Sequence, residues 1–281
     1  MYADDTTLVC SGNSITELQG NINECMDNVM SWFNSNHLVV NATKSNFMLV
    51  GTRQKLTSIG NDISVVINGN LLQQCTSAKL LGVMLDPYLS FDDHILYLRS
   101  KIAPKIGFIH RLRRLLPQAS LNAVYVTCIQ SLIDYCLTVY GNCTAKNRLA
   151  LQRLQNRAAR AVVGLFDYNV SVSQIIKELH WFNIDHRFLY FMSVLMYKCL
   201  NNMSPLYLSN KFAFISHENY TTRSASSMNL FLPRAHNALF QHSLVYSGPS
   251  IWNSLPRNIK ECSNLATFKA AVRNYYLSTS I

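Results

Sequence analysis

The sequence has 281 residues, of which 49% are hydrophobic and only 14% charged, and this composition excludes an intrinsically disordered chain because enough apolar residues are present for a packed core. Its formal net charge of +10 is unevenly divided, since residues 1–100 hold five Lys and Arg against nine Asp and Glu, whereas residues 101–281 hold twenty against six. A basic segment of this size indicates a polyanionic partner, most often nucleic acid.

The sequence also argues against membrane insertion and secretion. No apolar run approaches the roughly 18–20 residues that span a bilayer. Residues 1–5 have neither the basic nor the apolar region of a signal peptide. We therefore expect an intracellular protein, nuclear or cytoplasmic, whose eight cysteines are free thiols because none of them form a C-x-x-C pair.

Two adjacent carboxylates, Asp4 and Asp5, stand at the start of the sequence and precede residues 6–9, which have the composition of a strand. Neighbouring carboxylates repel each other, and a hard divalent cation such as Mg²⁺ relieves that repulsion. From these residues alone, a solvated acidic turn is the alternative interpretation.

A helix is predicted over residues 14–35. Ser14 and Glu17 have the spacing of a capping box, in which the side chain of each residue accepts a hydrogen bond from the backbone N–H of the other. The apolar residues that follow recur every three or four positions, as on one face of an amphipathic helix. They are Ile15, Leu18, Ile22, Met26, Val29 and Phe33.

Short strands are predicted after this helix. Asn68-Gly69 favours a type I′ hairpin turn, because both central residues of that turn have positive φ. The order of one helix followed by antiparallel strands predicts an α+β fold. The predicted strands are residues 37–40, 47–51, 63–67, 71–74 and 80–85.

Helices are predicted from residue 92 onward. Ser90 is a suitable N-cap, and Asp92 and Asp93 suit the first turn. Pro104 is expected to kink or divide the first helix, whose apolar face recurs at helical spacing. That face comprises Ile95, Leu98, Ile102, Ile106 and Ile109, and further helices are predicted over residues 120–140, 145–163, 173–179, 184–201 and 264–277, with a less regular stretch at 204–250.

Basic side chains recur along two of these helices, and such a surface could follow the phosphates of a nucleic-acid duplex. A solvated face of a helical bundle is the alternative. The pairs His180 with His186 and His236 with His242 have spacings that fit no zinc motif. The candidate nucleic-acid-binding residues are Lys101, Lys105, Arg111, Arg113, Arg114, Arg148, Arg153, Arg157 and Arg160.

Three motifs, in order within 86 residues, resemble the second half of the reverse transcriptase palm of non-LTR, LINE-class retrotransposons of the jockey type. They are Tyr2-Ala3-Asp4-Asp5, the L-x-x-N-x-x-K stretch from Leu38 to Lys44, and Leu81-Gly82-Val83. Phrases at 132–136, 154–160, 179–181 and 252–256 resemble the region that follows the palm in this family, so the resemblance covers essentially the entire chain.

The resemblance implies a partial palm at residues 1–89, a helical thumb-like region at 90–165 and a mainly helical tail at 166–281. It implies that Asp4 and, as an auxiliary, Asp5 are catalytic ligands of Mg²⁺, and that Lys44 approaches the nucleotide triphosphate. Leu81, Gly82 and Val83 would form the primer grip. The implied partners are an RNA template, a DNA primer and dNTPs.

The family's fingers and its other metal-binding aspartate precede the motif around Asp4, so the resemblance predicts a truncated RNA-directed DNA polymerase that is inactive alone. An exposed loop role for Lys44 and an ordinary strand at residues 81–83 stay open as alternatives. At the level of function, the alternatives are a non-enzymatic nucleic-acid-binding remnant and a helical protein-interaction module. The oligomeric state is left undetermined.

Overall fold

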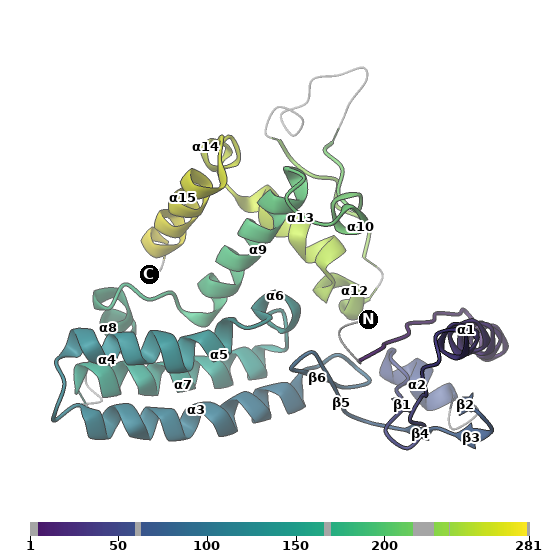
Figure 1. Cartoon of the computed structure of the whole chain (residues 1–281). Helices are drawn as coiled ribbons and strands as arrows, with labels where there is room; N and C mark the ends of the chain where they lie inside the picture. Colours follow the sequence, from purple (N-terminus) through teal and green to yellow (C-terminus); the bar gives the residue numbers. More distant parts are fainter. Residues whose placement is uncertain (1–4, 60–62, 166–169, 216–227, 236, 280–281) are drawn as a thin grey trace. The chain divides into compact units, whose positions relative to one another are not determined.

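The computed structural model describes residues 5–59, 63–165, 170–215, 228–235 and 237–279. The chain contains helices and small sheets, as the α+β prediction requires, and it forms two compact units, Met1–Ser90 and Phe91–Ile281 (Figure 1). The finer division into regions 1–89, 90–165 and 166–281 stays a prediction. None of the helices in the described ranges is long and apolar enough to cross a membrane.

The first unit begins with α1, Ile15–Ser35, at the place where the sequence predicts a helix. The Ser14 hydroxyl accepts a hydrogen bond from the backbone N of Glu17 at 3.1 Å, and the Glu17 carboxylate accepts one from the backbone N of Asn13 at 2.9 Å. The first bond satisfies an N–H group that the first helical turn leaves without a partner, as a capping box does, whereas the second reaches the residue before the N-cap instead of Ser14 itself. The apolar face of α1 packs against a small buried core that comprises Ile63, Val65, Ile67 and Leu72.

The described strands of the first unit form three two-stranded sheets. The Asn68-Gly69 turn is confirmed, because both residues have positive φ (49° and 77°) and join antiparallel strands. The prediction of antiparallel pairing throughout is wrong, since β1 and β4 are parallel. The pairs are β1 (Asn46–Phe47) with β4 (Gln73–Gln74), β2 (Val66–Ile67) with β3 (Asn70–Leu71), and β5 (Ala78–Leu80) with β6 (Val83–Leu85).

One other expectation for the first unit is wrong, and one element was not predicted. Residues 37–40 do not form a strand, although their composition suits one, because they pair with no described neighbour. A short helix, α2 (Arg53–Ile59), lies where no element was predicted, and the Arg53 guanidinium lies 5.1 Å from the centre of the Tyr88 ring.

The second unit opens with α3, Asp92–Leu112, a single helix that runs through Pro104 without dividing. Its predicted apolar face is confirmed, because Ile95, Ile102 and the other members of that face are buried. Ser90 does not cap this helix. The N-cap is Phe91, in the left-handed conformation, and the Ser90 hydroxyl bonds instead to the Asp86 carboxylate at 3.2 Å.

The helix predicted over residues 120–140 is interrupted. It consists of α4 (Gln118–Tyr125), the π-helix η1 (Val126–Gln130), α5 (Ser131–Asp134) and, after a break, α6 (Leu137–Tyr140). The break has a local cause, because Tyr135 leaves the helical conformation and Cys136 has φ of 54°. Next comes α7, Ala145–Val163, whose predicted bounds are confirmed.

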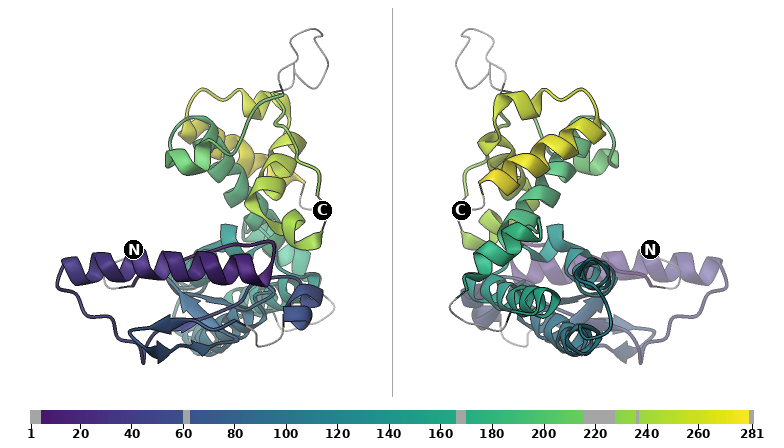
Figure 2. Two further views of the ribbon diagram at one scale, coloured as in Figure 1. Left: turned by 90° about the vertical axis from the view of Figure 1, so that its right-hand side faces the viewer. Right: turned by 90° about the vertical axis from the view of Figure 1, so that its left-hand side faces the viewer.

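The remaining helices include α9, which contacts α10, α13 and α15 among them. Figures 1 and 2 show that α9 connects the layer of α3, α4 and α7 with the group that contains α13 and α15, and α9 contacts α7, α13 and α15. The helices are α8 (Val172–Glu178), α9 (Ile184–Leu200), α10 (Leu206–Ser209), α12 (Ala238–His242), α13 (Leu244–Ser254), α14 (Arg257–Lys260) and α15 (Leu265–Ser278).

The core of this last part is aromatic. Trp252, Phe268 and Tyr197 are at most 2% exposed and stack on one another, with ring centroids 4.3 Å apart for Tyr197 and Phe268. Trp252 lies on α13, a helix that occupies part of the stretch predicted to be irregular and that contains Pro249. These aromatic side chains therefore bury α9, α13 and α15 against one another.

Candidate functional site

The predicted metal ligands are Asp4 and Asp5. Asp4 lies outside the described residues, and Asp5 is exposed. In the described ranges, no three His, Cys, Asp or Glu side chains are grouped so that they could hold a metal ion. Because Asp4 is not among the described residues, the metal-binding role of the pair stays a prediction. His236, of the second histidine pair, also lies outside the described residues.

Lys44 lies at the end of a turn that the Asn41 side chain stabilises. The Asn41 Oδ1 atom accepts hydrogen bonds from the backbone N of Thr43 at 3.1 Å and of Lys44 at 3.2 Å, and from the Thr43 hydroxyl at 2.7 Å. Asn side chains that bond to the backbone two residues later fix turns of this kind. The turn holds the backbone of Lys44 and leaves its side chain exposed. An exposed side chain is compatible both with contact to a nucleotide triphosphate and with an ordinary loop lysine.

Leu81, Gly82 and Val83 lie at the tip of the β5–β6 hairpin. The continuous strand predicted over residues 80–85 is therefore wrong, because Leu81 and Gly82 form a two-residue turn between Leu80 and Val83. Both turn residues have positive φ, 44° and 87°, so Gly82 avoids the steric cost that a Cβ would bring there. Val83 is buried and Leu81 is 47% exposed, which places an apolar side chain at the hairpin tip. The primer-grip role of the three residues stays a prediction.

Among the helices without an acidic residue in the described part of the chain, α7 has the largest number of cations. It carries five Lys and Arg residues and no Asp or Glu. Lys146, Arg153 and Arg157 are exposed and are separated by seven and four residues, a spacing that places them on one side of a helix. The opposite side is buried and includes Leu151, Leu154 and Ala158. The helix therefore presents a stripe of cations, Lys146, Arg153 and Arg157, which we call the α7 stripe.

Two other predicted cations of α7 have partners within the protein. Arg148 donates to the Asp185 carboxylate at 3.0 Å and to the backbone oxygen of Cys143 at 2.6 Å. Arg160 donates to the backbone oxygen of Val170 at 3.0 Å. Because these contacts fix the positions of the two guanidinium groups, Arg148 and Arg160 are less available to an external anion than the α7 stripe.

The predicted cations of α3 and its exit are mostly exposed. Lys101, Arg111, Arg113 and Arg114 are exposed, and Lys105 is half-buried. The sequence interpretation missed Arg99, which is exposed on α3, and Lys146 of the α7 stripe. The missed signal was the absence of acidic residues on α7, since that absence makes each of its exposed cations a candidate.

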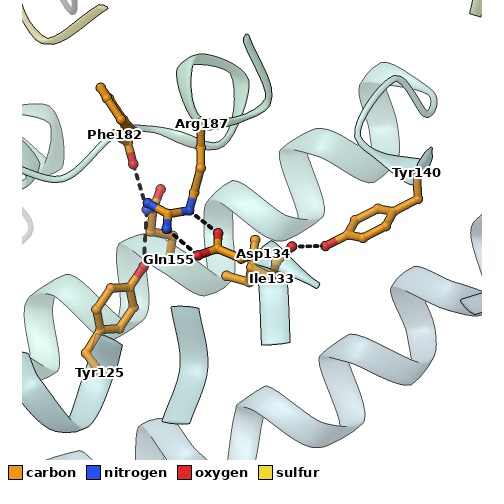
Figure 3. Close-up of polar contacts among 7 residues, drawn as sticks. All are labelled: Tyr125, Ile133, Asp134, Tyr140, Gln155, Phe182 and Arg187. Carbon is orange, nitrogen blue, oxygen red and sulfur yellow. Dashed lines mark hydrogen bonds and ion pairs between the residues drawn. The ribbon is translucent and has the colours of Figure 1, made fainter. Parts of the chain in front are cut away.

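A polar network fixes α7 and α9 relative to the interrupted helix (Figure 3). Gln155, buried on α7, donates to the Tyr125 hydroxyl at 3.2 Å and to the backbone oxygen of Phe182 at 2.8 Å. Arg187 on α9 donates two hydrogen bonds to the Asp134 carboxylate at the end of α5. Burial raises the pKa of Tyr125 to about 12, so its hydroxyl stays protonated at neutral pH.

This network defines the chemistry that the second unit supports. Its polar groups bind one another, through the ion pair of Asp134 with Arg187 and the hydrogen bond of Gln155 with Tyr125, so they serve to position helices. Exposed cations on α3 and α7 are available to a ligand. Exposed Lys and Arg side chains are the groups with which proteins contact the phosphates of nucleic acids, and such contacts supply a large share of the affinity.

Comparisons with known proteins find relatives among the polymerases of mobile elements. The chain is 30% identical over 167 residues to a probable RNA-directed DNA polymerase from transposon BS of Drosophila melanogaster, and 26% identical over 167 residues to the RNA-directed DNA polymerase from mobile element jockey of the same species. These matches cover 57% and 58% of the chain but 18% of each relative.

A third relative is the Pol polyprotein from the type-1 retrotransposable element R1 of Nasonia vitripennis. It is 29% identical over 116 residues, which are 40% of the chain and 34% of the relative. The chain thus spans a minor part of the length of these relatives. No family model and no solved structure matches it.

Proposed function

We propose, from the homology of this chain to the RNA-directed DNA polymerases of jockey-like and R1 non-LTR retrotransposons, that it contributes to RNA-directed DNA synthesis by holding the nucleic acid. Its substrate class is the hybrid duplex of an RNA template and a DNA primer. The observation that carries the proposal is the α7 stripe, a set of exposed cations on a helix without acidic residues.

The spacing of the stripe suits a phosphate backbone. Arg153 and Arg157 are four residues apart, which is about 6 Å along a helix at 1.5 Å per residue. Guanidinium groups bind phosphate through two parallel hydrogen bonds, whereas their contacts to phosphate carry no sequence information. We therefore propose that α7, with Lys101, Arg111 and the neighbouring cations of α3, follows a duplex with little preference for its sequence.

In the polymerase to which the chain contributes, we propose that Asp4 and Asp5 are ligands of a catalytic divalent metal, Mg²⁺. Homology to polymerases supports a metal requirement in general. Two metal ions would stabilise the attacking and leaving oxygens as dNTPs are added. In the same proposal, residues 81–83 contact the primer and Lys44 contacts the incoming nucleotide.

The experiment measures the affinity of the purified chain for a labelled RNA–DNA hybrid by fluorescence anisotropy at several salt concentrations. Reversing two charges of the α7 stripe, Arg153→Glu with Arg157→Glu, is expected to weaken binding at least about tenfold and to reduce the slope of log K against log salt by about 2, since each lost phosphate contact reduces it by about 1.

The matched control is Lys55→Glu with Lys269→Glu, which makes the same change in net charge at exposed positions on α2 and α15. We expect this control to change the salt slope much less. Equal losses in both variants would show that only net charge matters, and they would remove the α7 stripe from the proposed interface.

A further inference from the structure

Residues 10–12 of the first unit pack closely against the first half of α1. A Cβ atom at Gly12 would stand 2.7 Å from the backbone N of Leu18, so a side chain does not fit there unless the backbone shifts. One residue earlier, the backbone oxygen of Ser11 accepts a hydrogen bond from the Asn21 side chain at 2.8 Å. These two contacts fix the position of residues 10–12 on the helix.

Asn21 also lies beside the Cys10 side chain. The Cys10 Sγ atom is 4.0 Å from the backbone oxygen of Asn21. In an α-helix the backbone oxygen of a residue points at the N–H group four positions later, and the residue four positions after Asn21 is Cys25. The Cys10 side chain therefore reaches the turn of α1 that carries Cys25.

The thiols of Cys10 and Cys25 contact each other. They share a side-chain hydrogen bond, and both cysteines are half-buried and free. Burial, this hydrogen bond and the negative charge of a Cys25 thiolate raise the pKa of the Cys10 thiol, in that order of importance. Two sulfur atoms already in contact, fifteen positions apart in the sequence, can be joined with little movement of the backbone.

We infer that Cys10 and Cys25 are a redox-sensitive pair that forms a reversible disulfide within the chain when the protein meets a peroxide. In the first step the Cys25 thiolate attacks one oxygen of hydrogen peroxide, the O–O bond breaks, and hydroxide leaves and takes up a proton to form water. In the second step the Cys10 sulfur attacks the resulting sulfenic acid, the S–O bond breaks, and a second water leaves.

The electrons balance, because the two thiols lose two electrons and the peroxide gains them. Cys25 takes the first step because the raised pKa of Cys10 keeps that thiol protonated, whereas the thiolate is the nucleophile. Two molecules of a small thiol such as glutathione would reverse the bond by exchange and leave as the small disulfide.

The disulfide would tie the backbone that follows Asp5 to α1. A cross-link restricts the open and unfolded forms of a chain more than its folded form, so it opposes local opening. Oxidation is therefore expected to hold residues 5–13 on the helix. Reduction would return this segment to the contacts of Gly12, Ser11 and Asn21 alone.

The test uses the full chain and mass spectrometry. Trypsin and a glutamyl endopeptidase together cleave after Glu17, Glu24 and Lys44, so Cys10 and Cys25 fall in separate peptides, 1–17 and 25–44. After treatment with dilute hydrogen peroxide, alkylation with iodoacetamide and digestion without reductant, these peptides should be joined. Their yield should exceed that of any cross-link to Cys75 by about tenfold or more, because a disulfide requires Cα atoms within about 7 Å.

The substitutions Cys10→Ser and Cys25→Ser keep the size of the side chain and should each abolish the joined peptides. The matched control is Cys75→Ser, which removes another half-buried cysteine of the first unit and should leave their yield unchanged. Absence of the joined peptides from the wild-type chain, with its circular dichroism intact, would overturn the inference. A covalent dimer on a non-reducing gel in place of the bond within one chain would overturn it as well.

Hydrogen exchange measures whether the bond holds the segment on α1. In the oxidised wild-type chain, the amides of residues 5–13 should exchange about tenfold more slowly than in the reduced chain, since the cross-link opposes local opening. Peroxide should leave their exchange unchanged in the Cys10→Ser variant. Equal exchange in the oxidised and reduced wild-type chains would refute the tie. Neither measurement involves nucleic acid, so failure here leaves the proposed function standing, and loss of hybrid binding leaves this disulfide standing.

Discussion

Removing the ion pair between Asp134 and Arg187 should destabilise the second unit. The Asp134 side chain is 24% exposed and that of Arg187 is 11% exposed, so both charges are largely removed from water. Arg187 donates through both Nε and Nη2 to the two carboxylate oxygens, and its guanidinium lies 5.6 Å from the centre of the Phe191 ring. Either single substitution leaves the remaining charge in a poorly solvated position.

The magnitude follows from this partial burial. Breaking an exposed ion pair costs about 0.2–1 kcal/mol, and breaking a fully buried one costs about 3–5 kcal/mol. Because this pair is mostly buried, we expect about 2–3 kcal/mol from Asp134→Leu and somewhat more from Arg187→Met, which also loses the contact with Phe191. The double variant should be more stable than the sum of the two losses implies, since it leaves no unpaired charge.

Urea unfolding followed by tryptophan fluorescence measures these differences, because Trp181 and Trp252 are buried in the second unit. Far-UV circular dichroism on the same samples checks that both probes report one transition. A coupling energy of about 1 kcal/mol or more between the two substitutions is expected. Single losses below about 0.5 kcal/mol that add without coupling would refute the view that this pair fixes α9 to α5.

Two further predictions concern pH and catalysis. Burial lowers the pKa of His94 below its ordinary value of 6.5, so the unfolded chain binds a proton more readily than the folded one, and the unfolding free energy should be highest above pH 6.5 and decrease as the pH falls toward the folded-state pKa. In urea titrations between pH 8 and 5, His94→Phe should flatten this dependence. An unchanged profile would argue against His94 as its source. The second prediction uses a chimera that carries this sequence in place of the matching segment of the transposon BS polymerase. In it, Asp4→Ala should abolish Mg²⁺-dependent primer extension and Asp5→Ala should reduce it severely, whereas binding of the RNA–DNA hybrid should persist. Full extension by the Asp4→Ala chimera would reject the metal-ligand role.

The helices were predictable where their signals are local. Asn264 caps α15 by accepting from the backbone N of Thr267 at 2.9 Å, and Thr144 caps α7 in the same manner from Asn147 at 3.4 Å. Caps and apolar periodicity both act within a few residues, so a single sequence contains the information that sets these bounds. Helix α13 was missed because Pro249 and the polar residues around it suggest irregular structure, although Trp252 buries this helix in the aromatic core.

The strands were less predictable because pairing depends on distant residues. The parallel partners Asn46 and Gln73 are 27 positions apart, and nothing in either short segment specifies the other. The cations show the same limit. The sequence identifies Arg148 as readily as Arg153, but only the structure shows that Arg148 meets Asp185 whereas Arg153 remains exposed. The sequence predicts which segments are rich in cations, whereas tertiary contacts determine which of those cations a ligand can reach.

The π-helix η1 follows from the period of the apolar residues around it. Leu121, Tyr125, Ile129, Ile133 and Leu137 recur at intervals of four residues, and each is at most 1% exposed. In an α-helix of 3.6 residues per turn, each such interval drifts by about 40°, so Ile133 would rotate about 120° away from the direction of Leu121. Wider turns slow this drift and keep the side chains directed at the core. Deleting one residue of η1 would tighten the turn, so this segment should accept a one-residue deletion more readily than α7, whose apolar face already has the ordinary helical period.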